Sequence, residues 1–206
     1  MLRGNKGEWS EIYVLLKLLG EGRIYAADSE LRKMEDVYFP IIKVIREEIK
    51  DEIKEYAAGD IINIYVNGLK VKEILAAEFE REAEKLLTEI KNKKAKGAFE
   101  VVDTERFMEK ILCYKLSAPA KDKSDITIEI IDINTGYKPV VGFSIKSELG
   151  SAPTLLNAGK TTNFIYKIIH NYSNLVKETN AIYRVSGEKN HTDLRGRINK
   201  IIEVNG

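Results

Sequence analysis

The stretch "DITIEIIDINTGYKPVVGFSIKS", residues 125–147, joins two runs rich in Ile and Val through a central Asn-Thr-Gly. β-Branched residues on both sides of a Gly-containing reversal predict a β-hairpin. Asp125 opens the first predicted strand, and Lys146 lies near the end of the second. Because antiparallel pairing brings such positions together, the hairpin is expected to place an acid beside a lysine. A shift of one residue in register would separate the two side chains.

Helical and extended hydrophobic patterns alternate over the rest of the chain, and no internal repeat interrupts them. Apolar residues at helical spacing predict helices over residues 8–19, 75–93 and 104–114. β-Branched and aromatic runs predict strands over residues 23–28, 60–66, 69–75 and 161–169. This alternation predicts a single α/β domain that spans residues 1–206.

Capping and turn residues predict several boundaries. Gly20 and Gly22 are expected to end the first helix, because glycine readily adopts the left-handed conformation that terminates helices. Thr104 is expected to cap the N-terminus of the third helix. Asn67-Gly68 separates two strand patterns, and this dipeptide favours the positive φ angles of a tight hairpin turn.

The composition is that of a globular chain without an export signal. The 206 residues are 44% hydrophobic and 32% charged, and a net charge of +1 neither indicates nor excludes a nucleic-acid partner. The N-terminal segment lacks an apolar signal, so a cytoplasmic protein without a membrane partner is expected. The single Cys113 is expected to be a packing residue, and His170 and His191 to be structural or surface residues.

A second lysine, Lys160, offers a competing interpretation. Gly159-Lys160-Thr161 resembles the end of a phosphate-binding loop of nucleotide triphosphatases. That loop needs a glycine five residues before the Gly-Lys pair, and Thr154 occupies the position. Pro153 also removes one of the N–H groups that would face the phosphates. The pattern therefore does not favour a nucleotide triphosphatase.

The residues of the hairpin fit phosphodiester hydrolysis better than nucleotide triphosphate hydrolysis. It needs carboxylates that hold Mg²⁺, a water made more acidic by the metal, and a cation near the charge that develops on phosphorus. Asp125 and Lys146 supply an acid and the cation, as in the core of the PD-(D/E)xK nuclease arrangement. That arrangement has an acid two residues before the lysine, where this chain has Ser144. A second carboxylate must come from elsewhere, and spacing alone leaves four candidates: Glu8, Glu11, Glu129 and Glu148.

Four blocks, in the same order, resemble the HpaII-type restriction endonuclease family. They are "GNKGEWSEIYVLLKLLGEGRIYAAD" (4–28), "FPIIKVIRE" (39–47), "DKSDITIEIIDINTG" (122–136) and "GFSIKSELGSAPTLLNAGKTTNFIYKI" (142–168). The resemblance implies a PD-(D/E)xK nuclease-like mixed central sheet flanked by helices. It also implies a Mg²⁺-dependent type II endonuclease that cuts double-stranded DNA at a short palindrome, CCGG in the namesake, and leaves 5′-phosphate ends. A palindromic site implies a homodimer.

The resemblance makes Asp125 the metal-binding acid and Lys146 the catalytic lysine. The resemblance to the family includes the serine at position 144, so the second acid is expected to come from outside the hairpin. The first helix is the preferred source. Glu8 is preferred over Glu11 as the ligand that shares Mg²⁺ with Asp125, because Gly4 and Gly7 are expected to allow close approach there. Members of the family are longer, so this chain is expected to be truncated at its C-terminal end.

The polar segment after Lys146 is expected to contact DNA phosphates and base edges. Its candidate residues are Ser151, Thr154, Asn157, Lys160, Thr161, Thr162 and Asn163. The same composition also fits a structured turn that packs on the hairpin. An alternative function is a catalytically inactive DNA-binding or regulatory module, which Ser144 and the short C-terminus would favour.

Overall fold

The computed structural model describes residues 1–93, 97–117 and 124–149. They belong to the first of two compact units, Met1–Leu156, and the second unit, Asn157–Gly206, lies outside the described residues. The predicted strand over 161–169, the polar segment expected to contact DNA and both histidines are therefore not described.

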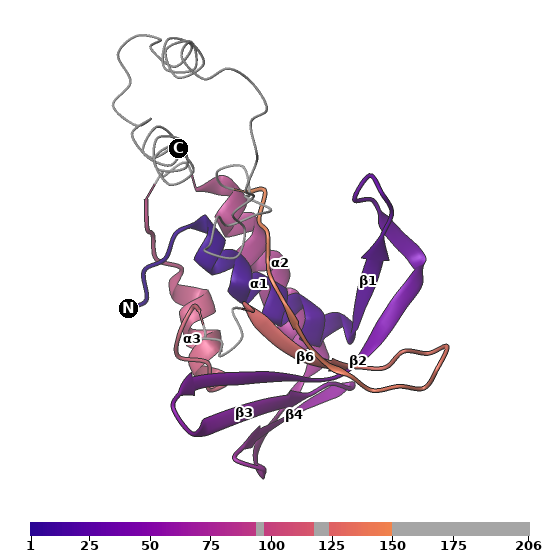
Figure 1. The fold of residues 1–206 in the computed structure, drawn as a ribbon. Helices are drawn as coiled ribbons and strands as arrows, with labels where there is room; N and C mark the ends of the chain where they lie inside the picture. Colours follow the sequence, from indigo (N-terminus) through magenta and orange to yellow (C-terminus); the bar gives the residue numbers. More distant parts are fainter. Residues whose placement is uncertain (94–96, 118–123, 150–206) are drawn as a thin grey trace, which may run out of the picture. The chain divides into compact units, whose positions relative to one another are not determined.

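Helices and strands both contribute to the described unit, which confirms the expected α/β class (Figure 1). The helices are α1 (Lys6–Glu21), α2 (Ala76–Asn92) and α3 (Val102–Lys110). The strands are β1 (Arg23–Ala27), β2 (Lys33–Ile49), β3 (Glu52–Ala57), β4 (Ile61–Val66), β5 (Leu69–Leu75), β6 (Ile126–Ile130) and β7 (Val140–Phe143).

The strands form a seven-stranded sheet in the order β5-β4-β3-β2-β6-β7, and β1 pairs with the first half of β2. Each strand pair in the described part of the chain is antiparallel, whereas a mixed sheet was expected. Short connections join β2 to β3, β3 to β4, β4 to β5 and β6 to β7. Such connections allow only antiparallel neighbours, because a parallel pair needs a long crossover.

The longest strand, β2, has no counterpart among the predicted elements. Its first half pairs with β1, and its second half pairs with β3 on one side and β6 on the other. Pro40 interrupts the sequence pattern and supplies no N–H to the ladder. The proline lies where β2 changes partners, and its carbonyl still accepts a hydrogen bond from Ile131 N at 2.8 Å. A strand that bridges two ribbons is therefore compatible with an internal proline.

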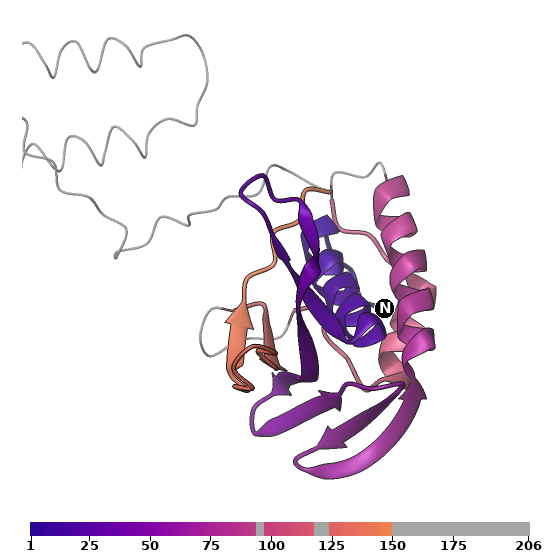
Figure 2. The same cartoon turned by 90° about the vertical axis from the view of Figure 1, so that its right-hand side faces the viewer.

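Helix α1 lies between the sheet and α2 (Figure 2), and it supplies much of the hydrophobic core. Its fully buried residues include Trp9, Ile12, Leu15, Leu16 and Leu19. Gly22 ends the helix with a φ of 65°, as predicted. Gly20 instead lies within the helix, where an added Cβ would be 2.8 Å from Glu80 N of α2. Gly20 thus permits close helix packing and does not end α1.

Other boundaries agree in part with the sequence. Asn67 and Gly68 form the predicted turn between β4 and β5, with φ angles of 49° and 80°. The prediction for α3 was wrong at both ends, since its N-cap is Val101 and the helix stops at Lys110. Thr104 lies in the first turn and is 1% exposed, so its side chain packs inside the protein and does not cap the helix.

The predicted hairpin exists, but both of its strands are shorter than expected. Strands β6 and β7 pair from Ile126 opposite Phe143 to Glu129 opposite Val140. Lys146 therefore lies three residues beyond β7 instead of within it.

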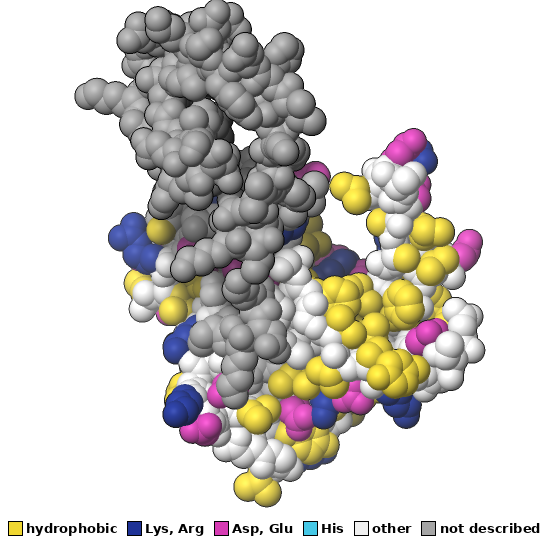
Figure 3. All heavy atoms as spheres, viewed as in Figure 1, with side chains coloured by type: hydrophobic (Ala, Val, Ile, Leu, Met, Phe, Trp, Pro, Cys, Tyr) yellow, Lys and Arg dark blue, Asp and Glu magenta, His cyan; other side chains and the backbone are white. Residues whose placement is uncertain are grey.

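One face of the described unit is partly apolar. Strand β1 and the first half of β2 project as a two-stranded ribbon (Figures 1 and 2). Figure 3 shows apolar side chains gathered over this ribbon and the β6–β7 hairpin. The exposed apolar residues of these elements and their connections are Leu31, Met34, Val37, Ile133, Tyr137 and Val140. None of the described helices is long and apolar enough to cross a membrane.

Candidate active site

Asp125 is held at the open end of the β6–β7 hairpin. Its N–H donates to Phe143 O at 2.9 Å, and its Oδ2 accepts a hydrogen bond from Ile145 N at 2.6 Å. Asp125 is thus tied to the backbone on both sides of Ser144, through its own N–H to Phe143 and through its half-buried carboxylate to Ile145. A charged acceptor bound to a backbone N–H is held in one orientation more firmly than a solvated one.

The negative charge of Asp125 acts on the carboxyl group of Glu11, which belongs to α1. The pKa of Glu11 is raised to about 7, chiefly by burial and next by the negative charge of Asp125. Ser117, as a hydrogen-bond donor, and the positive charge of Arg46 act in the opposite direction. Two half-buried carboxylates that interact in this way form an acidic pair, and such pairs are typical of sites that bind a cation or exchange a proton.

Glu8 lies near Glu11 but has a structural partner. Its Oε2 accepts from Asn5 N at 2.8 Å while its own N–H donates to Asn5 Oδ1 at 3.1 Å. This reciprocal capping box begins α1. The charge of Glu8 still contributes to the raised pKa of Glu11, as a smaller cause than Asp125.

The glycines near Glu8 also have structural explanations. Gly4 is buried and exchanges backbone hydrogen bonds with Phe99, and an added Cβ would be 2.3 Å from Leu116 Cδ1. Gly7 lies in the first turn of α1, where an added Cβ would be 3.1 Å from Asn5 Oδ1. Close packing at the N-terminus of α1 thus accounts for Gly4.

Lys146 and Ser144 are both exposed, in the segment that follows β7. Within the described part of the chain, Lys146 Nζ forms no hydrogen bond or ion pair. The next residue, Ser147, anchors this segment to α1, since its Oγ lies 2.8 Å from Ser10 Oγ. Ser10 precedes Glu11, so the contact brings the backbone around Lys146 to the same turn of α1 as Glu11.

The two remaining candidate acids lie in other surroundings. Glu129 forms an ion pair with Lys43 at 3.5 Å, and Glu148 is exposed beyond the hairpin. Among the described residues, no three His, Cys, Asp or Glu side chains are gathered closely enough to hold a metal ion. Among the candidate acids, the charge of Asp125 acts on the Glu11 carboxyl, and the charge of Glu8 does so more weakly.

Sequence reasoning did not identify Ser117 or Arg46, which both act on Glu11. Ser117 lies in an irregular segment after α3, and Arg46 belongs to the strand that was not predicted. Neither residue belongs to a recognisable motif, so only the fold reveals their positions.

The site and fold define a mixed α/β protein with an acidic pair between its first helix and a late hairpin. This chain belongs to the HpaII restriction endonuclease family, because the model of that family matches residues 5–206. It is also similar to the type II restriction enzyme HpaII of Haemophilus parainfluenzae, with 41% identity over 187 residues. The match covers 90% of this chain and 51% of that enzyme, so the chain spans about half the length of this relative. No solved structure matches the chain.

Proposed function

We propose that this chain carries the catalytic part of a Mg²⁺-dependent type II restriction endonuclease. Its substrate would be double-stranded DNA with a short palindromic site, CCGG in the first instance. The observation that carries the proposal is the match of the HpaII family model to residues 5–206. Similarity to an enzyme named for restriction activity supports it, and so does the effect of the Asp125 charge on Glu11. We also propose that the antiparallel sheet and its flanking helices are a variant of the PD-(D/E)xK nuclease fold.

The chemistry of the acidic pair fits Mg²⁺. This cation prefers carboxylate oxygens and commonly uses one or two protein carboxylates, with waters and substrate oxygens completing its shell. Glu11 and Asp125 would hold it, and their mutual repulsion would fall when a cation lies between them. Glu8 is the weaker candidate, because its Oε2 already accepts from the Asn5 N–H.

The bound cation would supply a more acidic water and would stabilise negative charge on the phosphate. The hydrogen bond from Ile145 N would hold the Asp125 carboxylate in one orientation for binding the ion. The exposed ammonium group of Lys146 would position the attacking water or offset charge that develops on phosphorus. In-line attack by water would leave a 5′-phosphate and a 3′-hydroxyl.

The polar segment from Ser151 to Asn163 is proposed to contact DNA, with Lys160 bound to a phosphate. A lysine followed by small hydroxyl and amide side chains suits phosphate and base-edge contacts. Because this segment lies outside the described residues, the proposal rests on composition and on its place in the chain after Lys146.

The test is cleavage of plasmid DNA that contains CCGG sites, first with Mg²⁺ and then with Ca²⁺ in its place. The wild-type chain should give discrete fragments with Mg²⁺ alone, and Asp125→Asn should lower the rate at least ~100-fold. Glu148→Gln is the matched control and should keep most activity, because this exposed acid lies outside the acidic pair. A gel shift without cleavage in any divalent metal would support the alternative, an inactive DNA-binding module.

A further inference from the structure

The segment that carries Lys146 alternates between residues that face the core and residues that face the solvent. Phe143, Ile145 and Leu149 are half-buried and pack against the hydrophobic core, whereas Lys146 is exposed. Ser147 takes the inward position between Ile145 and Leu149, although its side chain is polar. A hydroxyl group turned towards a core needs a hydrogen-bond partner, because leaving it unpaired costs free energy. The position of Ser147 therefore requires a specific polar contact.

A chain of hydrogen bonds joins Ser147 to helix α1. Leu149 N donates to Ser147 Oγ at 3.3 Å, and Ser147 Oγ lies 2.8 Å from Ser10 Oγ. Ser10 Oγ lies 2.7 Å from Lys6 O, in the preceding turn of the helix. The Lys6 carbonyl can only accept, so the single hydrogen of the Ser10 hydroxyl points to it, and Ser147 supplies the hydrogen between the two hydroxyls. Because Ser10 is only 3% exposed, water has little access to this end of the chain of bonds.

The backbone around Lys146 is held on both sides by groups from other elements. On the N-terminal side, Ile145 N donates to Asp125 Oδ2 at 2.6 Å. On the C-terminal side, Ser147 is bound to Ser10. These contacts lie one residue before and one residue after Lys146, so they restrict its backbone while its side chain stays exposed. An ammonium group on a flexible four-carbon stem reaches fewer positions when its backbone is fixed.

Packing alone does not require a serine at either position. Alanine at position 147 would fill the same inward site without a hydroxyl group to bury, and alanine at position 10 would favour the helix. A directional contact between two elements is what alanine would not supply. Ser10 directly precedes Glu11, so the Ser10–Ser147 hydrogen bond joins the segment of Lys146 to the turn of α1 that carries this acid.

We propose that Ser10 and Ser147 are positioning residues for Lys146. Their hydrogen bond holds the segment after β7 against α1, so that the ammonium group stands where the reaction needs a cation. The inference rests on the proposed function, in which Lys146 acts on the attacking water or on the charge at phosphorus. A displacement of about 1 Å, caused by a change away from the reacting atoms, can lower a rate about 100-fold.

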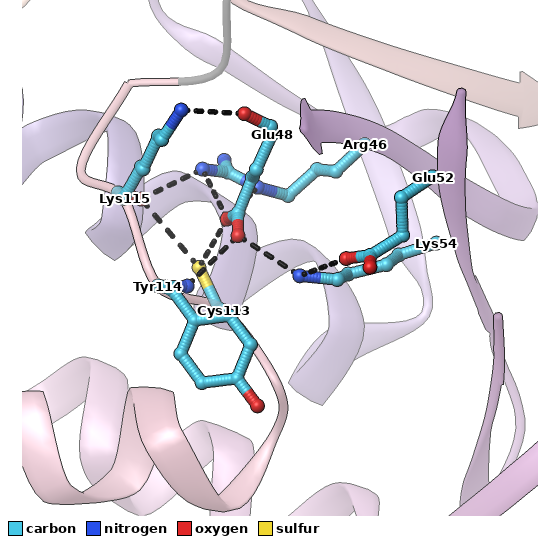
Figure 4. A network of polar contacts seen from close by, with 7 residues as sticks. All are labelled: Arg46, Glu48, Glu52, Lys54, Cys113, Tyr114 and Lys115. Atoms are coloured by element: carbon cyan, nitrogen blue, oxygen red, sulfur yellow. Dashed lines mark hydrogen bonds and ion pairs between the residues drawn. The ribbon is translucent and has the colours of Figure 1, made fainter. Parts of the chain in front are cut away.

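A second polar network in the same unit provides a matched control (Figure 4). Glu48 Oε2 accepts from Tyr114 N at 2.9 Å, and the fully buried Cys113 has its Sγ 3.3 Å from Glu48 Oε1. This network also joins an irregular segment to another element through buried side chains, but residues 113–115 include no candidate residue of the site. Cys113→Ala therefore removes a buried contact of the same general kind without changing the contacts around Lys146.

The test compares variants of the full chain in cleavage of plasmid DNA with Mg²⁺. Ser10→Ala and Ser147→Ala should each lower the single-turnover rate about 10-fold, while the affinity for DNA in Ca²⁺ stays that of the wild type. Ser147→Thr keeps the hydroxyl group and should cleave at the wild-type rate. Cys113→Ala should do so as well. If Ser10→Ala fails to fold, Ser147→Ala still decides the outcome.

A double-mutant cycle separates positioning from a general structural effect. When Ser147→Ala is added to Lys146→Ala, the residual rate should not fall further, because no ammonium group remains to be positioned. A purely structural serine would lower the rate by the same factor in both backgrounds. Hydrogen exchange gives a measurement without cleavage. The Leu149 amide should exchange faster in Ser10→Ala, which loosens Ser147, and at the wild-type rate in Cys113→Ala.

The outcomes also distinguish this inference from the proposed function. If the wild type cleaves DNA and both alanine variants of the serines cleave at the same rate, positioning is refuted and the nuclease stands. Equal rate losses from Ser147→Ala with and without the Lys146 side chain would refute positioning in the same way. If the wild-type chain leaves the plasmid intact in Mg²⁺, the proposed function fails and the positioning inference fails with it.

Discussion

At the scale of single residues, the raised pKa of Glu11 separates its role from that of Glu8. The pKa of Glu11 is about 7 in the folded chain and near 4.5 for an unperturbed carboxyl. The folded protein therefore binds this proton more tightly than the unfolded chain. Its contribution to stability is complete below pH 4.5 and is lost as the pH rises through 7.

Glu11→Gln should therefore lower cleavage at least ~100-fold and also stabilise the chain at pH 8. The gain in unfolding free energy should be on the order of 1 kcal/mol after solvent screening, and it should vanish near pH 4. Urea unfolding at both pH values measures the gain. Glu8→Gln is the control, because glutamine also completes a capping box and should leave stability nearly unchanged. Loss of activity in Glu8→Gln with normal cleavage by Glu11→Gln would reverse the assignment.

The surroundings of Cys113 make its thiol unreactive. Burial raises the pKa of its thiol to about 12, and its side chain is fully buried beside Glu48. Because the thiolate is the reactive form, the folded protein should not react with an aromatic disulfide reagent at pH 8. The unfolded chain should react with one equivalent. Fast labelling under native conditions would show that Cys113 and Tyr114 separate readily from Glu48, despite the contacts that both make with its carboxylate.

At the scale of elements, the contact between α1 and α2 depends on Gly20. Alanine there would gain helix propensity of about 1 kcal/mol. The added methyl group would, however, be 2.8 Å from Glu80 N and 2.9 Å from Glu80 Cα, which only movement of the helices can relieve. Gly20→Ala should therefore destabilise the protein by about 1–3 kcal/mol in thermal unfolding. Thr88→Ala, at an exposed position on α2, should be neutral or slightly stabilising. A stabilised Gly20→Ala would mean that the helices pack farther apart.

The elements also show what the sequence can and cannot reveal. α2 and the Asn67-Gly68 turn were predictable, because their hydrophobic spacing and turn chemistry are local properties. The length of β2 was not, since its two halves pair with different strands around Pro40. The end of β7 was also not predictable. Residues after Phe143 leave the sheet because Asp125 and Ser10 bind them from other elements.

The residues of the candidate site were also predictable from the sequence only in part. Residue types near the hairpin indicated Asp125 and Lys146, and the family resemblance indicated an acid from the first helix. The choice between Glu8 and Glu11 depends on a capping box at Glu8 and on the burial of Glu11 near the charge of Asp125, which comes from a distant part of the chain. Spacing carries no information about contacts of that kind.

At the scale of the whole molecule, the question is how one chain would cut two DNA strands. The described residues contain one acidic pair, formed by Glu11 and Asp125. A palindrome presents two equivalent phosphodiesters related by a dyad, so a symmetric dimer would supply one pair to each strand. Exposed apolar residues on the β1–β2 ribbon and the β6–β7 hairpin have the character of surfaces that bind other proteins.

We therefore expect the active species on DNA to be a homodimer, and subunit mixing tests this. Wild-type chains are combined with an excess of Asp125→Asn chains and incubated with supercoiled plasmid and Mg²⁺. Mixed dimers hold one working acidic pair, so they should cut one strand at each site and accumulate nicked circles. Wild-type chains diluted with buffer alone provide the control, and light scattering on a short duplex gives the stoichiometry. If the mixture yields linear plasmid directly, at a rate that only reflects the amount of wild-type chain, each chain cuts both strands by itself and the dimer is not needed.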